Sequence, residues 1–115
     1  MKNDCITIPY SIFNSELFRN SHEFTAFIWL VFKASKHPEV VTCRHSEIWL
    51  KRGEIVVSTR DFANQFKWSQ SKAVRFFKKL EKTGRIKIVG KGEKPSNLPT
   101  ILKICNYSQF EGPLS

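Results

Sequence analysis

The chain has few cysteines, few acidic side chains and no long hydrophobic run. Cys5, Cys43 and Cys105 are far apart and form no CxxC pair, so they predict neither a disulfide framework nor a standard zinc site. The longest apolar run, Ala26 to Phe32, is too short to span a membrane, and the N-terminus lacks the apolar core and cleavage pattern of a signal peptide. These absences favour a reduced, cytoplasmic protein.

Catalytic chemistry also has little support. The ten acidic residues are scattered, and no pair of carboxylates stands where acid–base catalysis could use it. The glycines of residues 90–95, GKGEKP, lack the ending of a phosphate-binding loop. Cys43 and His45 do not have structural zinc spacing with Cys5, His22 or His37. We therefore expect no enzyme, no cofactor and no metal site.

The chain has an excess of positive charge. Nineteen lysines and arginines against ten acidic residues give a net charge of +9 over 115 residues, a length that suits one domain. Ten basic and two acidic residues lie between Lys67 and Lys94, whereas the remaining 87 residues carry nine basic and eight acidic ones. This confined excess indicates a polyanionic partner, either nucleic acid or an anionic membrane surface.

The N-terminal half predicts one helix, a loop and a hairpin. Ser21 can cap a helix from about His22 to Ala34, which is apolar on nearly every side. Such a helix is either central in the core or covered by a partner, and the corresponding self-association surface would consist of Phe24, Phe27, Trp29 and Phe32. Residues 35–45 contain Pro38 and predict a loop. Residues 47–58 contain two β-rich runs around a turn at Gly53, which predicts a short hairpin or strand pair.

Two helices with a short turn follow. Ser58 or Thr59 can cap a helix over residues 60–66, and Ser69 can cap a second helix that runs to about Thr83, where Gly84 is placed to end it. This outline is typical of a helix-turn-helix. Residues 85–89 and 100–105 then alternate as two antiparallel strands, with inward Ile86, Ile88, Leu102 and Ile104 and outward Lys87 and Lys103. A basic hairpin directly after such a helix predicts a wing.

The second helix has two opposite faces on a wheel of 100° per residue. Its apolar face consists of Ala73, Phe76, Phe77 and Leu80, and its opposite face of Ser71, Arg75, Lys78 and Lys82, with Lys72 and Lys79 on one flank. A lysine-rich face is often simply solvated. Here the scarcity of acidic partners on the helix and the further lysines in the strand pair favour nucleic-acid binding.

Each cationic or polar side chain of this region has an expected role. Gln70, Ser71 and Arg75 are candidates for base contact in the major groove, because glutamine can bond adenine and arginine guanine. The lysines of the helix and the wing, and Arg60, are candidates for phosphate contact. The expected DNA-binding residues are Arg60, Ser69, Gln70, Ser71, Lys72, Arg75, Lys78, Lys79, Lys82, Lys87, Lys91 and Lys94.

Several segments together carry a resemblance to a known family. They are Lys51 to Gly53, Ser58, the Trp68-Ser69 turn, Ser71 to Leu80, Gly84 and Ile104 to Tyr107. In this order they resemble the N-terminal winged-helix domain of phage replisome organisers and related replication initiators of phages and mobile elements, over about Tyr10 to Phe110. The resemblance implies an α+β winged helix-turn-helix, with a three-helix core, a small antiparallel β-sheet and a wing. It also implies binding to double-stranded DNA at an origin, and recruitment of the replicative helicase or its loader through a further C-terminal region.

We therefore expect a winged-helix DNA-binding domain over residues 1–110, followed by a tail or the start of a linker at 111–115. Replication initiation is the leading function. Two alternatives remain open, because winged helices serve several purposes: transcriptional regulation of a phage or mobile element, and a protein-interaction module that uses the aromatic helix.

Overall fold

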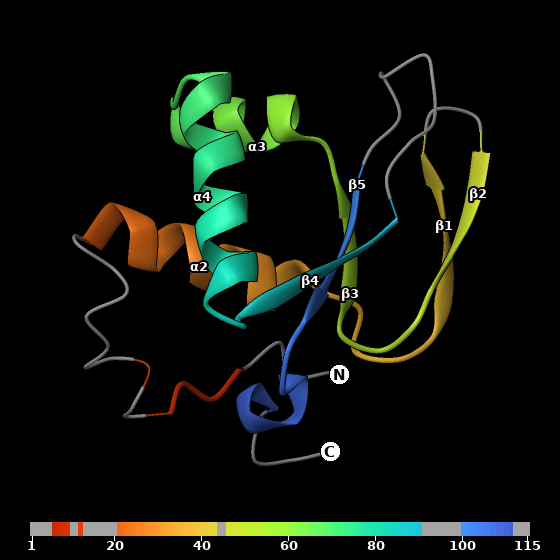
Figure 1. Ribbon diagram of the computed structural model, residues 1–115. Coiled ribbons are helices and arrows are strands. Elements are labelled where there is room, and N and C mark those ends of the chain that lie inside the picture. Colours follow the sequence, from red (N-terminus) through yellow and green to blue (C-terminus); the bar gives the residue numbers. More distant parts are fainter. Residues whose placement is uncertain (1–5, 10–11, 13–20, 44–45, 91–99, 112–115) are drawn as a thin grey trace.

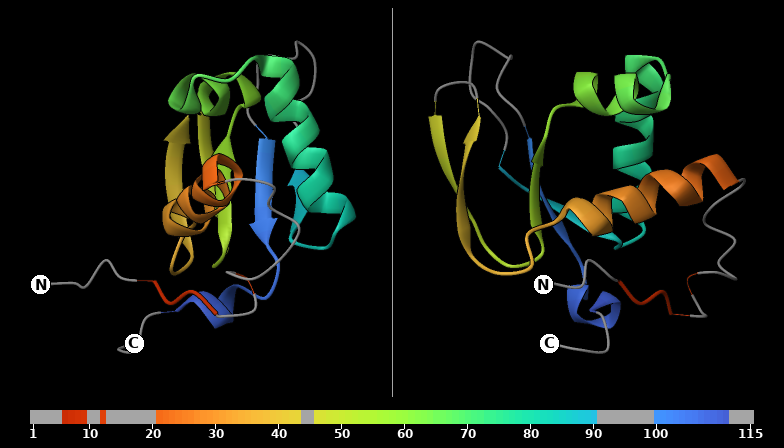
Figure 2. Two further views of the ribbon diagram at one scale, coloured as in Figure 1. Left: turned by 90° about the vertical axis from the view of Figure 1, so that its left-hand side faces the viewer. Right: turned by 180° about the vertical axis from the view of Figure 1, so that it is seen from behind.

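The computed structural model of the chain describes residues 6–9, 12, 21–43, 46–90 and 100–111. Within these ranges it contains three α-helices, a two-stranded sheet and a three-stranded sheet, both antiparallel. The helices lie on one side of the three-stranded sheet, and the two-stranded sheet lies on the other (Figures 1 and 2). The predicted α+β class is confirmed, and the arrangement is compatible with a winged-helix-like fold.

Helix α2, Ser21–Lys33, begins and ends one residue earlier than its sequence predicts. Its core side consists of Ala26, Phe27, Leu30 and Val31, all buried, because these positions recur at the helical spacing. Phe27 is 1% exposed and packs edge-on against Phe110. The helix is therefore a core element along this side. In the described part of the chain, no helix has both the length and the apolar character needed to cross a membrane.

The predicted loop over residues 35–45 is wrong for residues 39–43, which form a strand. Strand β1, Glu39–Cys43, begins directly after Pro38 and pairs with β2, Ser46–Leu50, in an antiparallel ribbon. A proline that precedes the first residue of a strand removes no ladder hydrogen bond. The β-branched run of Val40, Val41 and Thr42 then favours the extended backbone. We call β1 and β2 together the ribbon.

The predicted hairpin around Gly53 is also wrong in its pairing. The turn exists, with Gly53 at φ +85°, but β3, Glu54–Val57, pairs with β5, Thr100–Ile104, rather than with β2. The strand order in this sheet is β3-β5-β4. Inward Ile55 and Val57 are buried beneath the helices, which favours this long-range pairing over a local hairpin.

The two short helices form as predicted. Helix α3, Thr59–Phe66, is capped by Ser58, whose hydroxyl oxygen accepts a hydrogen bond from the Asp61 amide at 3.0 Å. Helix α4, Gln70–Lys82, is capped in the same way by Ser69, which accepts from the Lys72 amide at 3.1 Å. Thr83 follows the last residue of α4, and Gly84 comes next with φ +80°.

The two antiparallel strands predicted after α4 are also confirmed. Strand β4, Ile86–Gly90, pairs with β5 so that Ile86 faces Ile104 and Ile88 faces Leu102. These four side chains face the core, whereas Lys87 and Lys103 are exposed on the opposite face of the sheet. Side chains alternate between the two faces of a strand, so the apolar positions set this register.

The end of the described chain stays attached to the domain. A 3-10 helix, Tyr107–Phe110, buries both of its aromatic rings, and the carboxylate of Glu111 forms an ion pair with Arg52. Burial raises the pKa of the Tyr107 phenol, an effect to which Glu111 adds and which the nearby Arg52 guanidinium opposes. The expected tail therefore begins no earlier than residue 112, and residues 112–115 lie outside the described ranges.

Two glycines with positive φ predict different costs of substitution. An alanine Cβ at Gly53 would lie 3.0 Å from the Tyr107 Cβ, whereas at Gly84 it would meet open space. Gly53→Ala should lower the free energy of unfolding by about 2–4 kcal/mol, through backbone strain and the clash. Gly84→Ala should cost only about 1–2 kcal/mol, from backbone strain alone. Urea denaturation of both variants measures the difference, and equal losses would show that the contact with Tyr107 is unimportant.

Candidate nucleic-acid interface

Helix α4 divides into a buried and an exposed side, as its helical wheel predicts. The buried side chains are Ala73, Phe76, Phe77 and Leu80. The exposed ones are Gln70, Ser71, Arg75, Lys78, Lys82 and the acidic Glu81, and Lys72 and Lys79 are partly buried at the flank. Because the aromatic side anchors the helix in the core, its cationic side is held outward on a rigid element.

The turn between α3 and α4 is held by aromatic packing. Lys67 adopts the left-handed conformation at φ 59°, and the Trp68 amide donates a hydrogen bond to the Ala63 carbonyl at 2.8 Å. The Trp68 ring then packs against Phe62 and other aromatic side chains of the two helices. Lys72 lies over the Trp68 ring, with its Nζ 4.4 Å from the ring centroid. This contact restrains Lys72 on the outer side of the turn.

The N-terminal ends of the two helices lie side by side. The Gln70 side-chain amide is 3.4 Å from the Thr59 hydroxyl, which joins the first residue of α4 to the first residue of α3. Arg60, the next residue of α3, is exposed there. The positive ends of two helix dipoles and a guanidinium therefore occur together, an arrangement that favours an anion such as a phosphate.

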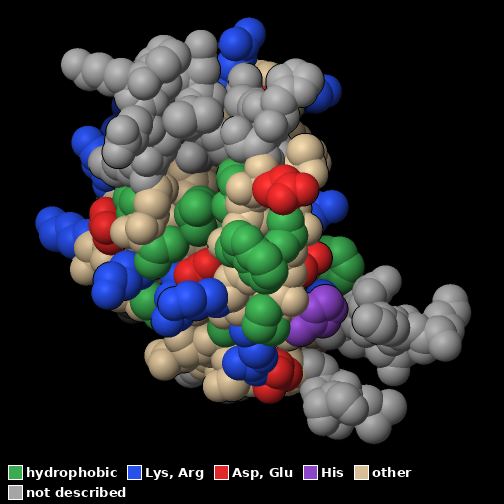
Figure 3. All heavy atoms as spheres, turned by 90° about the vertical axis from the view of Figure 1, so that its right-hand side faces the viewer, with side chains coloured by type: hydrophobic (Ala, Val, Ile, Leu, Met, Phe, Trp, Pro, Cys, Tyr) green, Lys and Arg blue, Asp and Glu red, His purple; other side chains and the backbone are tan. Residues whose placement is uncertain are grey.

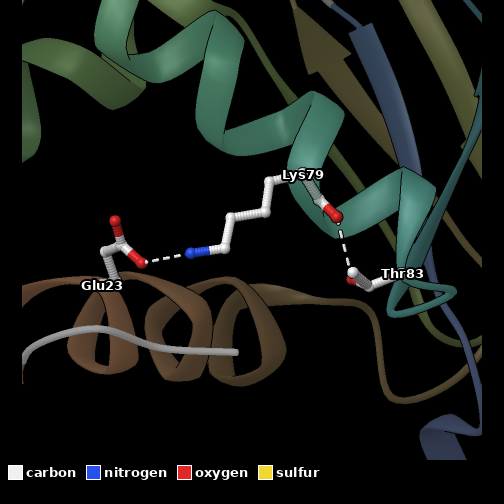
Figure 4. Close-up of polar contacts among 3 residues, drawn as sticks. All are labelled: Glu23, Lys79 and Thr83. Carbon is white, nitrogen blue, oxygen red and sulfur yellow. Dashed lines mark hydrogen bonds and ion pairs between the residues drawn. The ribbon is translucent and has the colours of Figure 1, made fainter. Parts of the chain in front are cut away.

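Lys79 differs from the other lysines of α4. Its Nζ lies 2.9 Å from a carboxylate oxygen of Glu23, in an ion pair that joins α4 to α2 (Figure 4). The Lys79 and Glu23 side chains are 30% and 17% exposed, respectively. The charge of Lys79 is thus largely balanced within the domain, and its side chain supports the position of α4. The next residue of the same flank, Thr83, donates its hydroxyl hydrogen to the Lys79 carbonyl oxygen at 2.8 Å.

The expected wing residues are only partly described. Lys91 and Lys94 lie outside the described ranges. Lys87 is exposed, but strand alternation places it on the sheet face opposite to the helices, so the structure does not bring it together with Arg75 and Lys78. Lys87 is directly opposite Lys103, and like charges at such positions disfavour the sheet. Lys103 was not among the expected site residues, although the alternation of the two strands predicted that it faces outward like Lys87.

The aromatic surface expected on α2 loses one member. Phe27 is buried in the core and cannot take part, whereas Phe24, Trp29 and Phe32 line an apolar groove with Ile28. Among the residues that the structure describes, histidine, cysteine and acidic side chains do not gather in groups of three or more that could hold a metal ion.

Comparisons of the chain with models of protein families, with curated proteins and with solved structures find no match. The resemblance to replication initiators therefore stays a prediction from the residues of this chain.

Proposed function

We propose that the chain binds double-stranded DNA as a winged helix-turn-helix, with α4 as the recognition helix in the major groove. The observation that carries the proposal is the division of α4 into a buried aromatic side and an exposed cationic side, next to the N-terminal end of α3. A rigid helix with such a face fits a polyanion whose groove admits a helix.

The exposed side chains divide into two roles. Gln70, Ser71 and Arg75 come from the first half of α4 and contact base edges, where arginine can bond guanine with two hydrogen bonds. Phosphates are contacted by Arg60, Lys72, Lys78 and Lys82. Lys79 is left out of this set because Glu23 balances its charge. Lys91 and Lys94, expected from the sequence to contact phosphates, lie outside the described residues.

The cellular role is replication initiation at an origin of a phage or mobile element, supported by the resemblance of residues 10–110 to that family. Transcriptional regulation is the second candidate, because the same interface would serve an operator equally well. Binding to clustered repeats in an origin would support replication initiation. A footprint beside a promoter would support transcriptional regulation. Recruitment of a helicase or its loader belongs to the replication role.

Salt dependence tests the proposal directly. Four phosphate contacts predict that log K falls against log salt with a slope of about −4, and further wing contacts make it steeper. Fluorescence anisotropy with a labelled duplex between about 50 and 200 mM salt measures this slope. A flat response would contradict the proposal, because an apolar contact scarcely depends on salt.

Two neighbouring lysines make a matched pair for the same assay. Lys78→Met should reduce the slope by about 1, because one phosphate contact is lost. Lys79→Met should leave the slope unchanged and instead lower the free energy of unfolding by up to about 1 kcal/mol, because it removes the ion pair with Glu23. If both variants change the slope of log K against log salt equally, Lys79 contacts a phosphate in spite of its ion pair with Glu23.

A further inference from the structure

The ribbon presents an exposed apolar pair on its outer face. Val40 and Trp49 are direct cross-strand partners, and Trp49 is 76% exposed. Glu47 lies on the same face, because it is two residues from Trp49 along β2. Figure 3 shows hydrophobic side chains gathered in the middle of the surface on this side of the molecule, with both acidic and basic side chains beside them. A tryptophan this exposed is the type of side chain that forms the centre of a protein interface.

The helical side of the molecule carries an apolar groove of about 510 Å³. Its apolar lining comes from α2 and the segment that precedes it, and includes Ile6, Ile8, Phe24, Ile28, Trp29 and Phe32. Two lysines lie beside rings that line the groove. Lys33 Nζ is 5.9 Å from the centroid of the Trp29 ring, and Lys36 Nζ is 5.1 Å from the centroid of the Phe32 ring. The groove is therefore apolar inside and positively charged at its rim.

The two surfaces match each other in size and in charge. The groove has room for an indole ring and an adjacent aliphatic side chain, which is what Trp49 and Val40 offer. On the Trp49 face of the ribbon the acidic residue is Glu47, whereas Glu39 lies on the opposite face, where its carboxylate accepts a hydrogen bond from the Ser35 hydroxyl. The groove rim has the opposite sign, with Lys33 and Lys36.

We propose that copies of this chain associate head to tail, with Trp49 and Val40 of one copy seated in the α2 groove of the next and Glu47 facing Lys33 and Lys36. Within one chain this contact cannot form, because the ribbon and the helices lie on opposite sides of the three-stranded sheet (Figures 1 and 2). A symmetric contact between two ribbons would instead bring Glu47 of both copies to one interface and leave the groove uncovered.

A head-to-tail contact has a specific consequence. Each copy that joins leaves one ribbon and one groove exposed at the ends, so association continues beyond the dimer. The contact uses none of the α4 residues assigned to DNA. The proposal of self-association can therefore be tested separately from the proposed function.

Sedimentation velocity of the whole chain without DNA provides the first test. We expect reversible association as the concentration rises to about 1 mM, a range in which weak contacts of limited area are populated. Trp49→Ser should raise the dissociation constant by about thirtyfold or more, as for an aromatic residue at the centre of an interface. Val89→Ser is the matched control, because Val89 is also an exposed apolar strand residue, 45% exposed on β4, and it should have no effect. A monomeric wild type throughout this range would overturn the proposal.

A mixing experiment distinguishes the head-to-tail contact from a symmetric one. Phe32→Glu places a negative charge in the groove where Glu47 of the next copy should lie, and Phe32 is exposed enough to tolerate it. Trp49→Ser and Phe32→Glu chains should each be monomeric, with circular dichroism spectra and melting temperatures like those of the wild type. Mixed together, they should form a one-to-one dimer and nothing larger, because one chain retains its groove and the other its Trp49. Failure of the mixture to associate would overturn the head-to-tail arrangement.

Discussion

Reversing the charges of Arg75 and Lys78 together should weaken duplex binding by about 100-fold or more. Both side chains are exposed on the outer side of α4, one turn of helix apart along the predicted groove contact. Arg75→Glu removes a bidentate contact worth about 1–3 kcal/mol, and Lys78→Glu places a negative charge against a phosphate. Fluorescence anisotropy at one fixed salt concentration measures the change.

A matched control separates the helix face from the total charge. Lys36→Glu with Lys51→Glu also lowers the net charge from +9 to +5, because each substitution removes one positive charge and adds one negative charge. These two lysines are exposed in the connections after α2 and β2, away from α4. This control should bind within about threefold of wild type, since only long-range attraction is reduced. Equal losses in both double variants would mean that binding responds to overall charge and not to α4.

Phe62→Ala should lower the free energy of unfolding by about 3–5 kcal/mol. Phe62 is fully buried, and its ring contacts aromatic side chains from α2, α3, the turn and α4. The ring centroids of Phe62 and Phe77 are 4.9 Å apart. Truncation leaves a cavity between the elements that position α4, so a substantial share of the stability of a domain of this size should be lost. Urea denaturation measures the loss, and the slope of the unfolding free energy against urea concentration should be unchanged.

Phe32→Ala is the control for this prediction. The substitution is chemically identical, but Phe32 is 39% exposed at the surface of α2. It should cost less than about 1.5 kcal/mol, because much of the ring already contacts water. Similar losses at both positions would contradict the assignment of Phe62 to the centre of the core. The Phe62 variant should also bind duplex DNA more weakly wherever its folded fraction falls, whereas Phe32→Ala should bind normally.

The helices of the candidate interface could be predicted because their signals are local. Ser58 and Ser69 bond amides three residues ahead, and Gly84 follows the last turn of α4, so each end depends on a few neighbouring residues. The two sides of α4 follow from helical spacing alone. The alternation of apolar and lysine residues in β4 and β5 was likewise sufficient to predict their pairing.

The errors concern contacts between distant parts of the chain. The Gly53 turn was recognised, but β3 pairs with β5, which is far along the sequence. Strand β1 was predicted as a loop because Pro38 precedes it. The acidic partner of Lys79 lies 56 residues away, so no spacing within α4 could indicate it. The apolar residues of α2 and the ribbon did not show by themselves that Phe27 is buried and Trp49 exposed, because that depends on which surfaces other elements cover.

The most direct test of the central claim is selection of bound sequences from a random duplex pool by the purified chain at moderate salt. If α4 reads base edges with Gln70, Ser71 and Arg75, the bound fraction should be enriched in one sequence motif. The genomic position of matches to that motif then decides between an origin and an operator. Retention without enrichment would contradict base reading by α4, and the absence of any retained duplex would contradict DNA binding itself.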